Sequence, residues 1–244
     1  DGSIFDGAVG EVYAEKMLKI YELATKTGVP VIGIYDSAGP RWQEGIVTAH
    51  MQAQILRAAA QASGLIPQIA IVAGETASLA ATTVPLSDVT VMVEGAALHL
   101  TDVGAVRTVS DADATAHSVG GLQVHAEATG LAHVAAPTVD AAIDQVRSLL
   151  AYLPLNNRAA SPLGADAEMG ADSPTQSALD LDTFMPDDDA AAYDATEIIN
   201  AVTDSDFFEL GASYASNVIT GFAHLGGRAI GVVATQPSVL AGCL

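Results

Sequence analysis

The sequence has almost no cysteine, few cations and no long apolar run. Its single cysteine, Cys243, excludes an internal disulfide, and no Cys/His spacing is typical of a zinc site. Only 9 Lys and Arg stand against 29 Asp and Glu, a formal net charge of −20. Nucleic-acid binding is therefore not expected, because it needs a basic surface that neutralises phosphate groups. Gly, Pro or Asp interrupts every apolar run within about ten residues, which is too short to cross a bilayer.

Aromatic residues are also scarce, at 5% of the 244 residues, although hydrophobic residues make up 50%. Ala, Val, Ile and Leu must therefore fill the interior, as they do in layered α/β proteins. The acidic surplus favours solubility, and it means that an anionic substrate needs a locally positive pocket. No signal peptide is recognisable, so a cytoplasmic location is expected. The opening residue is Asp and not Met, which leaves open where the natural N-terminus lies.

Helical and strand patterns alternate in the first half of the chain. Residues 11–27 have the spacing of an amphipathic helix, and Gly28 follows where a C-terminal cap belongs. The apolar, β-branched run 29–35 predicts a strand buried on both faces. The further predicted elements are a helix at 42–62, a strand at 68–73, a helix at 75–86 and a strand at 89–93. This alternation predicts a parallel sheet covered by helices.

The second half has a different character. A helix is predicted over 138–152, with Thr138 as its N-cap. Residues 155–189 are rich in Pro, Asp, Ala, Ser and Gly, which is typical of a linker or surface crossover. Asp194, with Glu197 three residues later, indicates the start of another helix. Gly226-Gly227 separates two apolar segments, as a two-residue hairpin turn does.

The loop Asp36 to Gly39 is the first candidate for chemistry. It follows a predicted strand and precedes a predicted helix. Its peptide N–H groups are therefore free of a strand ladder and suit a developing oxyanion. Small residues in such loops also serve close packing, so a purely structural role stays open.

Residues 36–45, DSAGPRWQEG, resemble the D-S-G-G-A-R-x-Q-E-G stretch of carboxyltransferase (β) subunits of biotin-dependent acyl-CoA carboxylases. Upstream, GEVYAEK at 10–16 is similar to the family's G-E-V-H-A-E-K, and KTGVPVI at 26–32 to its K-T-G-x-P-V-I. YLPLNN at 152–157 is similar to Y-L-P-x-N-N, and ordered blocks continue to 242–244. The resemblance covers essentially the whole chain.

This resemblance implies an α/β fold, a crotonase-like ββα superhelix (ClpP/crotonase type) with a partial second domain. The implied domains are 1–154, an N-terminally incomplete carboxyltransferase (acyl-CoA) domain; 155–193, a linker or crossover; and 194–244, the truncated start of a C-terminal carboxyltransferase domain. The implied reaction moves CO₂ from carboxybiotin to the α-carbon of a short- or medium-chain acyl-CoA of the acetyl- or propionyl-CoA type. Biotin is then carried by a biotin carboxylase/biotin carboxyl carrier partner. The β subunits form a homo- or hetero-oligomer, a hexamer by resemblance, and this chain needs no metal.

The resemblance also assigns residues. The peptides of Ala38 and Gly39 correspond to the Gly-Gly pair whose N–H groups hold the thioester enolate. Ser37, Arg41, Ala77 and Ser78, from the family's two loops, are the expected substrate-binding residues. Residues that contact carboxybiotin stay unassigned, since that half follows Leu244. Arg41 has an equally good alternative role, a structural salt bridge with a nearby acid.

Four residues of these two loops depart from the family pattern. Ala38 replaces a glycine, and Pro40 replaces an alanine and so lacks an N–H, although proline also suits the first turn of a helix. Ser78 and Leu79 stand where the family has the two glycines of A-G-G-A. Leu79 either points into the core or blocks or reshapes the acyl pocket. A degenerate β paralogue kept for assembly is therefore the alternative function. A crotonase-type hydratase or thioesterase is disfavoured, because no acid/base Glu pair is recognisable.

Overall fold

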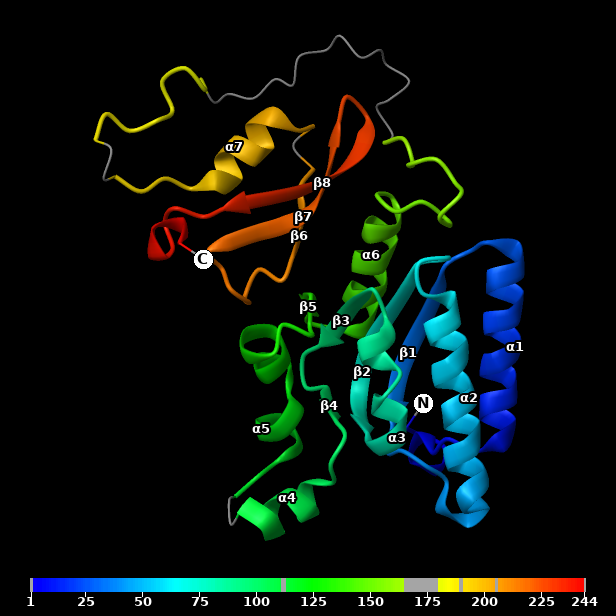
Figure 1. Ribbon diagram of the computed structural model, residues 1–244. Helices are drawn as coiled ribbons and strands as arrows, with labels where there is room; N and C mark the ends of the chain where they lie inside the picture. The colour runs from blue at the N-terminus through cyan, green and yellow to red at the C-terminus, as the bar shows by residue number, and fades with distance from the viewer. Residues whose placement is uncertain (1, 111–112, 165–179, 189–190, 205, 244) are drawn as a thin grey trace. The chain divides into compact units, whose positions relative to one another are not determined.

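The computed structural model describes residues 2–110, 113–164, 180–188, 191–204 and 206–243. The chain forms two compact units. The first contains residues 1–146 and 155–159, and the second contains residues 147–154 and 160–244. Figure 1 shows the helices and strands of both units.

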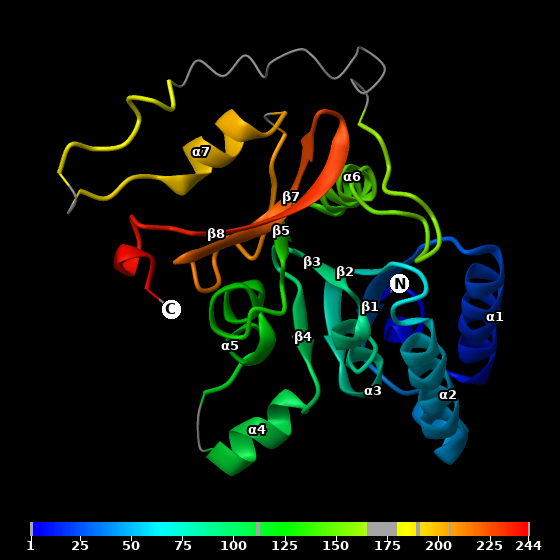
Figure 2. The ribbon, with the colours of Figure 1, turned by 45° about the horizontal axis from the view of Figure 1, so that its top comes forward.

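A parallel sheet forms the centre of the first unit (Figures 1 and 2). Its strands follow the order β1 (Val31–Ser37), β2 (Gln68–Ala77), β3 (Val89–Val93) and β5 (Val134–Ala136). The short strand β4 (Ala97–His99) pairs in parallel with the last residues of β2. The parallel sheet predicted from the alternating pattern is confirmed.

Two long helices, α1 (Glu11–Thr27) and α2 (Ile46–Ala62), pack against β1. Small and apolar side chains of both helices share one buried cluster with Val31. Helix α1 ends as predicted, at Gly28, which adopts the left-handed φ of 69° that glycine reaches without strain.

Strand β1 is less buried than its sequence predicts. The side chains of Ile32 and Ile34 are 44% and 56% exposed, whereas Val31 and Tyr35 on the alternate face are buried. The prediction of a strand buried on both faces is therefore wrong for this chain. One face of β1 packs on α1 and α2, and β1 lies at an end of the strand order.

Two predicted helices also differ from the structure. The helix predicted at 42–62 is a short 3₁₀ turn, η2 (Trp42–Glu44), followed by α2, because Gly45 breaks the path with φ 57° and ψ −135°. The helix predicted at 75–86 is wrong. There β2 continues to Ala77, and only two short helical segments follow, α3 (Ser78–Ala81) and η3 (Val84–Leu86). Pairing with β4 keeps this end of β2 extended.

The remaining elements up to residue 150 are short, except for α6, which the division between the two units crosses. They are η1 (Phe5–Gly7), α4 (Val103–Ser110), α5 (Ala116–Gly120), the π-helical turn η4 (Val124–Ala128) and α6 (Val139–Leu150). Helix α6 confirms the helix predicted at 138–152. The hydroxyl of Thr138 accepts a hydrogen bond of 3.1 Å from the N–H of Ala141, as an N-cap does.

The second unit contains an antiparallel sheet of β6 (Phe208–Leu210), β7 (Val218–Leu225) and β8 (Arg228–Thr235). Helix α7 (Ala195–Val202) packs on it through Ala195 and Ile199, and Asp194 caps this helix as predicted. The predicted hairpin is confirmed, with φ of 58° and 73° at Gly226 and Gly227. A 3₁₀ turn, η6 (Leu240–Gly242), follows.

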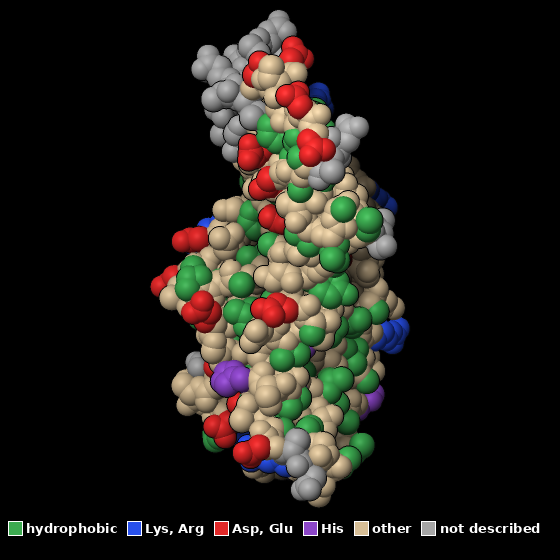
Figure 3. All heavy atoms as spheres, turned by 90° about the vertical axis from the view of Figure 1, so that its left-hand side faces the viewer, with side chains coloured by type: hydrophobic (Ala, Val, Ile, Leu, Met, Phe, Trp, Pro, Cys, Tyr) green, Lys and Arg blue, Asp and Glu red, His purple; other side chains and the backbone are tan. Residues whose placement is uncertain are grey.

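The predicted linker lies partly outside the described residues, and the division at 154 and 193 stays a prediction. Within the described part of the chain, every helix is too short or too polar to cross a lipid bilayer. On the face drawn in Figure 3, Lys and Arg side chains are few beside Asp and Glu, in keeping with the net charge of −20.

Candidate active site

The loop that follows β1 is fixed by Ser37. This side chain is buried, and its hydroxyl donates a hydrogen bond of 2.6 Å to the carbonyl oxygen of Gly7. Ser37 also pairs with Thr76 of β2. The carboxyl ends of two parallel strands thus meet at one edge of the sheet, where ligands of open α/β sheets commonly bind.

Both predicted oxyanion donors have partners within the chain. The N–H of Ala38 donates to the carbonyl oxygen of Asp6 at 2.8 Å. The N–H of Gly39 donates to the Ser37 hydroxyl oxygen at 3.3 Å, a long and therefore weak hydrogen bond. An incoming oxyanion must displace Asp6 before it reaches Ala38. The catalytic assignment of Ala38 and Gly39 stays a prediction.

Gly39 is the point at which the two predicted loops touch. Its φ is +106°, a value that L side chains rarely adopt. A Cβ added there would lie 2.9 Å from Ser78 Cβ and 3.1 Å from the Ala77 carbonyl oxygen. The predicted substrate-binding residues Ala77 and Ser78 are therefore in contact with the Ala38-Gly39 segment.

Pro40 does not begin a helix. It forms an isolated bridge with Val9, and η2 begins two residues later, at Trp42. Val9 donates to the Gly39 carbonyl oxygen at 2.8 Å and accepts from the Arg41 N–H at 2.9 Å. The interpretation of Pro40 as a first-turn proline is wrong, and this proline instead lies in an extended segment tied to Val9.

Arg41 forms a salt bridge with a nearby acid, Glu44, which is the second of the two roles predicted for it. Its guanidinium lies 3.5 Å from Glu44 Oε1 and 5.2 Å from the centre of the Phe5 ring. The carboxylate of Glu44 also accepts a hydrogen bond of 2.6 Å from the N–H of Glu11, at the start of α1. Arg41 stays 44% exposed, so an anionic ligand can still reach it.

Two cavities border the loop. One, of about 340 Å³, is lined by Phe5, Asp6, Ala8, Ala38, Pro40, Arg41, Trp42 and Gln43. The other, of about 300 Å³, is lined by Pro40, Trp42, Gly45, Ile46, Thr48, Ala49, Ser78 and Leu79. The half-buried Leu79 thus faces a cavity beside the loop, which favours the reshaped pocket over a core position.

Sequence reasoning missed the roles of Asp6, Trp42 and Glu44. Glu44 belongs to the family stretch at 36–45, so the sequence singled it out. Nothing in the sequence indicated its contact with the start of α1. Trp42 is 80% exposed and lines both cavities. Nothing in the sequence indicates that Asp6 reaches Ala38.

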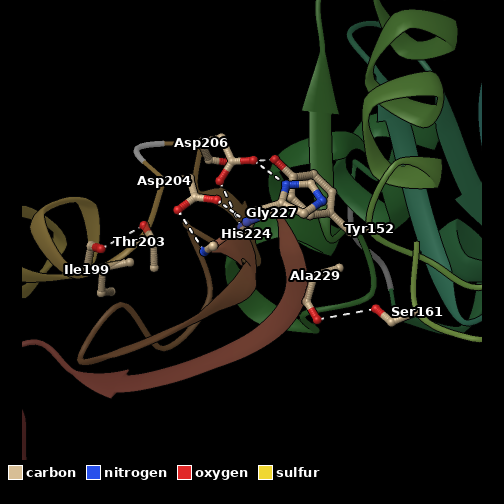
Figure 4. A network of polar contacts seen from close by, with 10 residues as sticks. Tyr152, Ser161, Ile199, Thr203, Asp204, Asp206, His224, Gly227 and Ala229 are labelled. Atoms are coloured by element: carbon tan, nitrogen blue, oxygen red, sulfur yellow. Dashed lines mark hydrogen bonds and ion pairs between the residues drawn. The ribbon is translucent and has the colours of Figure 1, made fainter. Parts of the chain in front are cut away.

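A second polar cluster, also missed, lies in the second unit (Figure 4). His224 Nδ1 contacts the Asp206 carboxylate, which also accepts from the His224 N–H at 2.9 Å. The ring of Tyr152 stacks on His224 at 4.6 Å, and its hydroxyl donates to the Asp206 carbonyl oxygen. The buried His224 Nε2 has no hydrogen-bond partner among the described residues.

Burial and neighbouring groups shift the pKa values of Tyr152 and Asp206 in this cluster. Burial, and second the Asp206 carboxylate, raise the pKa of Tyr152 to about 12. Burial alone would raise the pKa of Asp206, but hydrogen bonds from the His224 side chain and backbone outweigh it and lower that pKa. The cluster therefore stabilises the second unit, and neither of the two cavities beside the loop is lined by it.

The described residues contain no group of three or more His, Cys, Asp or Glu side chains arranged to hold a metal ion. The two cavities are lined by peptide groups, the Arg41 guanidinium, apolar side chains and a few polar side chains such as Asp6 and Ser78. Such a site can polarise a carbonyl or thioester oxygen by oriented N–H dipoles.

Comparisons with known proteins give one consistent family. The model of the carboxyl transferase domain matches residues 1–244. The chain is 41% identical over its whole length to the biotin-dependent acetyl-/propionyl-coenzyme A carboxylase beta5 subunit of Mycobacterium tuberculosis, of which it covers 45%. It is 40% identical to the propionyl-CoA carboxylase beta chain of Saccharopolyspora erythraea, of which it covers 46%.

A solved structure of transcarboxylase 12S, with hydrolyzed methylmalonyl-coenzyme A bound, matches the fold with a TM-score of 0.94 and 34% identity. It matches over 100% of this chain, which covers 48% of that one. The chain thus spans about half the length of these relatives.

Proposed function

Because the chain belongs to the carboxyl transferase domain family, we propose that it provides the acyl-CoA site of a biotin-dependent acyl-CoA carboxylase. The family and the crotonase-like α/β fold class predicted from the sequence are confirmed. The observation that carries the proposal is the contact of Gly39 with Ala77 and Ser78, which joins the two family loops at one edge of the sheet. The proposed reaction is transfer of a carboxyl group to the α-carbon of a short- or medium-chain acyl-CoA of the acetyl- or propionyl-CoA type.

The chemistry asked of this chain is stabilisation of negative charge. Loss of the α-proton places charge on the thioester oxygen, which peptide dipoles can hold without an acidic or basic side chain. The N–H groups of Ala38 and Gly39 take this role, after the Asp6 carbonyl leaves Ala38. Carboxybiotin, carried by a partner subunit, would supply the carboxyl group, and the biotin nitrogen left by that group would take up the α-proton. We assign none of the described residues to hold carboxybiotin.

The remaining predicted residues position the substrate. Ser37 fixes the loop through its hydrogen bond to Gly7. Ala77 and Ser78 form the wall opposite Gly39. Arg41, partly exposed beside the larger cavity, attracts a phosphate or carboxylate of the substrate. Arg41 is the one Lys or Arg within residues 36–45 of this acidic chain.

The proposal includes a biotin carboxylase/biotin carboxyl carrier partner, an oligomer of β subunits and a cytoplasmic location. The relatives support the biotin-dependent reaction, and the structural neighbour transcarboxylase 12S is a hexamer assembly. The alternative, a degenerate subunit kept for assembly, is not favoured by relatives that are named as carboxylase subunits.

Incorporation of label from bicarbonate into propionyl-CoA, in the presence of ATP and the biotin-carrying partner, tests the proposal. We expect incorporation that falls at least about 100-fold in Gly39→Pro, because a lost oxyanion donor costs about that much. Gly95→Ala is the matched control, since a Cβ at Gly95 meets no atom within 4 Å and Gly95 lines neither cavity. Incorporation that is equal in wild type and Gly39→Pro would contradict the assignment.

A further inference from the structure

The smaller cavity beside the loop is walled by large apolar side chains. Trp42 and Ile46 are 80% and 83% exposed, and Leu79 and Pro40 are further apolar residues of the wall, which also includes the hydroxyl-bearing Thr48 and Ser78. Exposing two large apolar side chains next to one another is unfavourable in water. A ligand that covers them would gain the free energy of their burial.

This cavity adjoins the proposed thioester position directly. Pro40 follows Gly39 in the chain and lines both cavities, and Ser78 contacts the Gly39 position while lining the smaller one. Arg41 lines the larger cavity and not the smaller. A thioester held at Gly39 is therefore close to both cavities, the larger one lined by Arg41 and Asp6 and the smaller one mainly by apolar side chains.

We infer that the apolar cavity receives the acyl chain of the CoA thioester, and that Trp42 and Leu79 select chains longer than propionyl. This inference rests on the proposed function, because it takes the thioester to lie at Gly39. A propionyl group carries only a methyl beyond the reacting carbon, too little to cover Trp42 and Ile46. Each further methylene buried against this wall raises affinity about fourfold.

Trp42 is the only tryptophan of the chain, so its fluorescence reports the cavity directly. We expect hexanoyl-CoA and octanoyl-CoA to shift its emission to shorter wavelength, because the acyl chain removes the indole from water. Free CoA and acetyl-CoA leave the emission wavelength unchanged. Dissociation constants from the same titrations fall about fourfold per methylene from butyryl- to octanoyl-CoA.

Two variants of the cavity wall test whether the acyl chain binds in this cavity. Ile46→Ala and Leu79→Ala reduce the gain to below about twofold per methylene, since they remove part of the wall. Ile46 is exposed, so its truncation leaves the fold intact. Leu100→Ala, in a separate apolar cavity with Ala81 and Leu98, is the matched control and keeps the wild-type gain.

The outcomes separate the two claims. CoA thioesters that bind with equal affinity at every chain length, with no change in Trp42 emission, would overturn the inference and leave the proposed function standing. A fourfold gain that survives both Ile46→Ala and Leu79→Ala would also overturn it, since the acyl chain would then lie elsewhere. Failure of every CoA thioester to bind would defeat the proposed function, and the inference with it.

Discussion

The N–H of Ala38 donates a hydrogen bond of 2.8 Å to the carbonyl oxygen of Asp6. Asp6 reaches this position in a left-handed conformation, with φ 53° and ψ 29°. A residue other than glycine pays conformational energy for such torsions. The free chain thus satisfies the proposed oxyanion donor with one of its own carbonyl groups, which a substrate oxygen must replace.

Gly7→Ala should release this contact. A Cβ at Gly7 would lie 2.2 Å from the Asp36 carbonyl oxygen, and φ there is +66°, so the turn that carries Asp6 must move. We expect faster hydrogen exchange at the Ala38 amide, measured by NMR. Gly95→Ala is the control, because Gly95 has a φ of +79° but open space around its Cβ position. An Ala38 exchange rate unchanged by Gly7→Ala would contradict this account of the turn.

Gly39→Ala should destabilise the chain more than Gly95→Ala. Both positions have positive φ, but only the Cβ at Gly39 meets other atoms, the nearest at 2.9 Å. We expect the free energy of unfolding to fall by more than about 2 kcal/mol for Gly39→Ala and by about 1 kcal/mol for Gly95→Ala. Urea denaturation measures both, and equal losses would show that the two loops do not press on Gly39.

Ser78→Gly should stabilise the chain. Ser78 has a φ of 56°, which glycine adopts without the strain imposed by a Cβ. The expected gain is up to about 1 kcal/mol, seen as a higher melting temperature. Ala80→Gly, in the same short helix α3 at a position with no positive φ, should lose about 1 kcal/mol instead. A loss from Ser78→Gly would mean that its side chain matters more than its torsion.

Acidification should weaken the second unit through Asp206. Its pKa is lower in the folded chain than in the unfolded one, mainly because hydrogen bonds from His224 outweigh burial. The ionised carboxyl therefore stabilises the fold above its unfolded pKa of about 3.9, and this contribution is lost as the pH falls through the lowered value.

The test compares urea midpoints of wild type and Asp206→Asn at neutral pH and near pH 3. We expect the wild type to be more stable at neutral pH and the difference to shrink in acid. Asp187→Asn, at an exposed carboxyl, should differ little from wild type at either pH. A difference that stays constant with pH would refute the role of ionised Asp206.

Local patterns in the sequence predicted the elements whose causes are local. Helix α1 with its Gly28 cap and the Gly226-Gly227 hairpin follow from spacing and turn chemistry. The helix predicted at 75–86 failed because Glu75 pairs with Ala97 of β4, a contact that no local pattern encodes. The same holds for the Asp6–Ala38 contact, which joins the site to a distant segment of the chain.

Only part of the candidate site could be predicted from the sequence. Family resemblance identified the loop around Gly39 and the run at Ala77-Ser78, and the structure brings them into contact. The exposure of Trp42 could not be predicted, because it depends on where Gly45 ends the turn and α2 begins. A pattern read alone predicts an uninterrupted helix there.

The most direct test of the account observes the two proposed oxyanion donors themselves. The amide resonances of Ala38 and Gly39 are followed in the ¹⁵N-labelled chain during titration with octanoyl-CoA. The account predicts that both amide protons move downfield, with a half-saturation equal to that of the Trp42 emission. Resonances of Ala38 and Gly39 that stay fixed while octanoyl-CoA saturates the chain would contradict it.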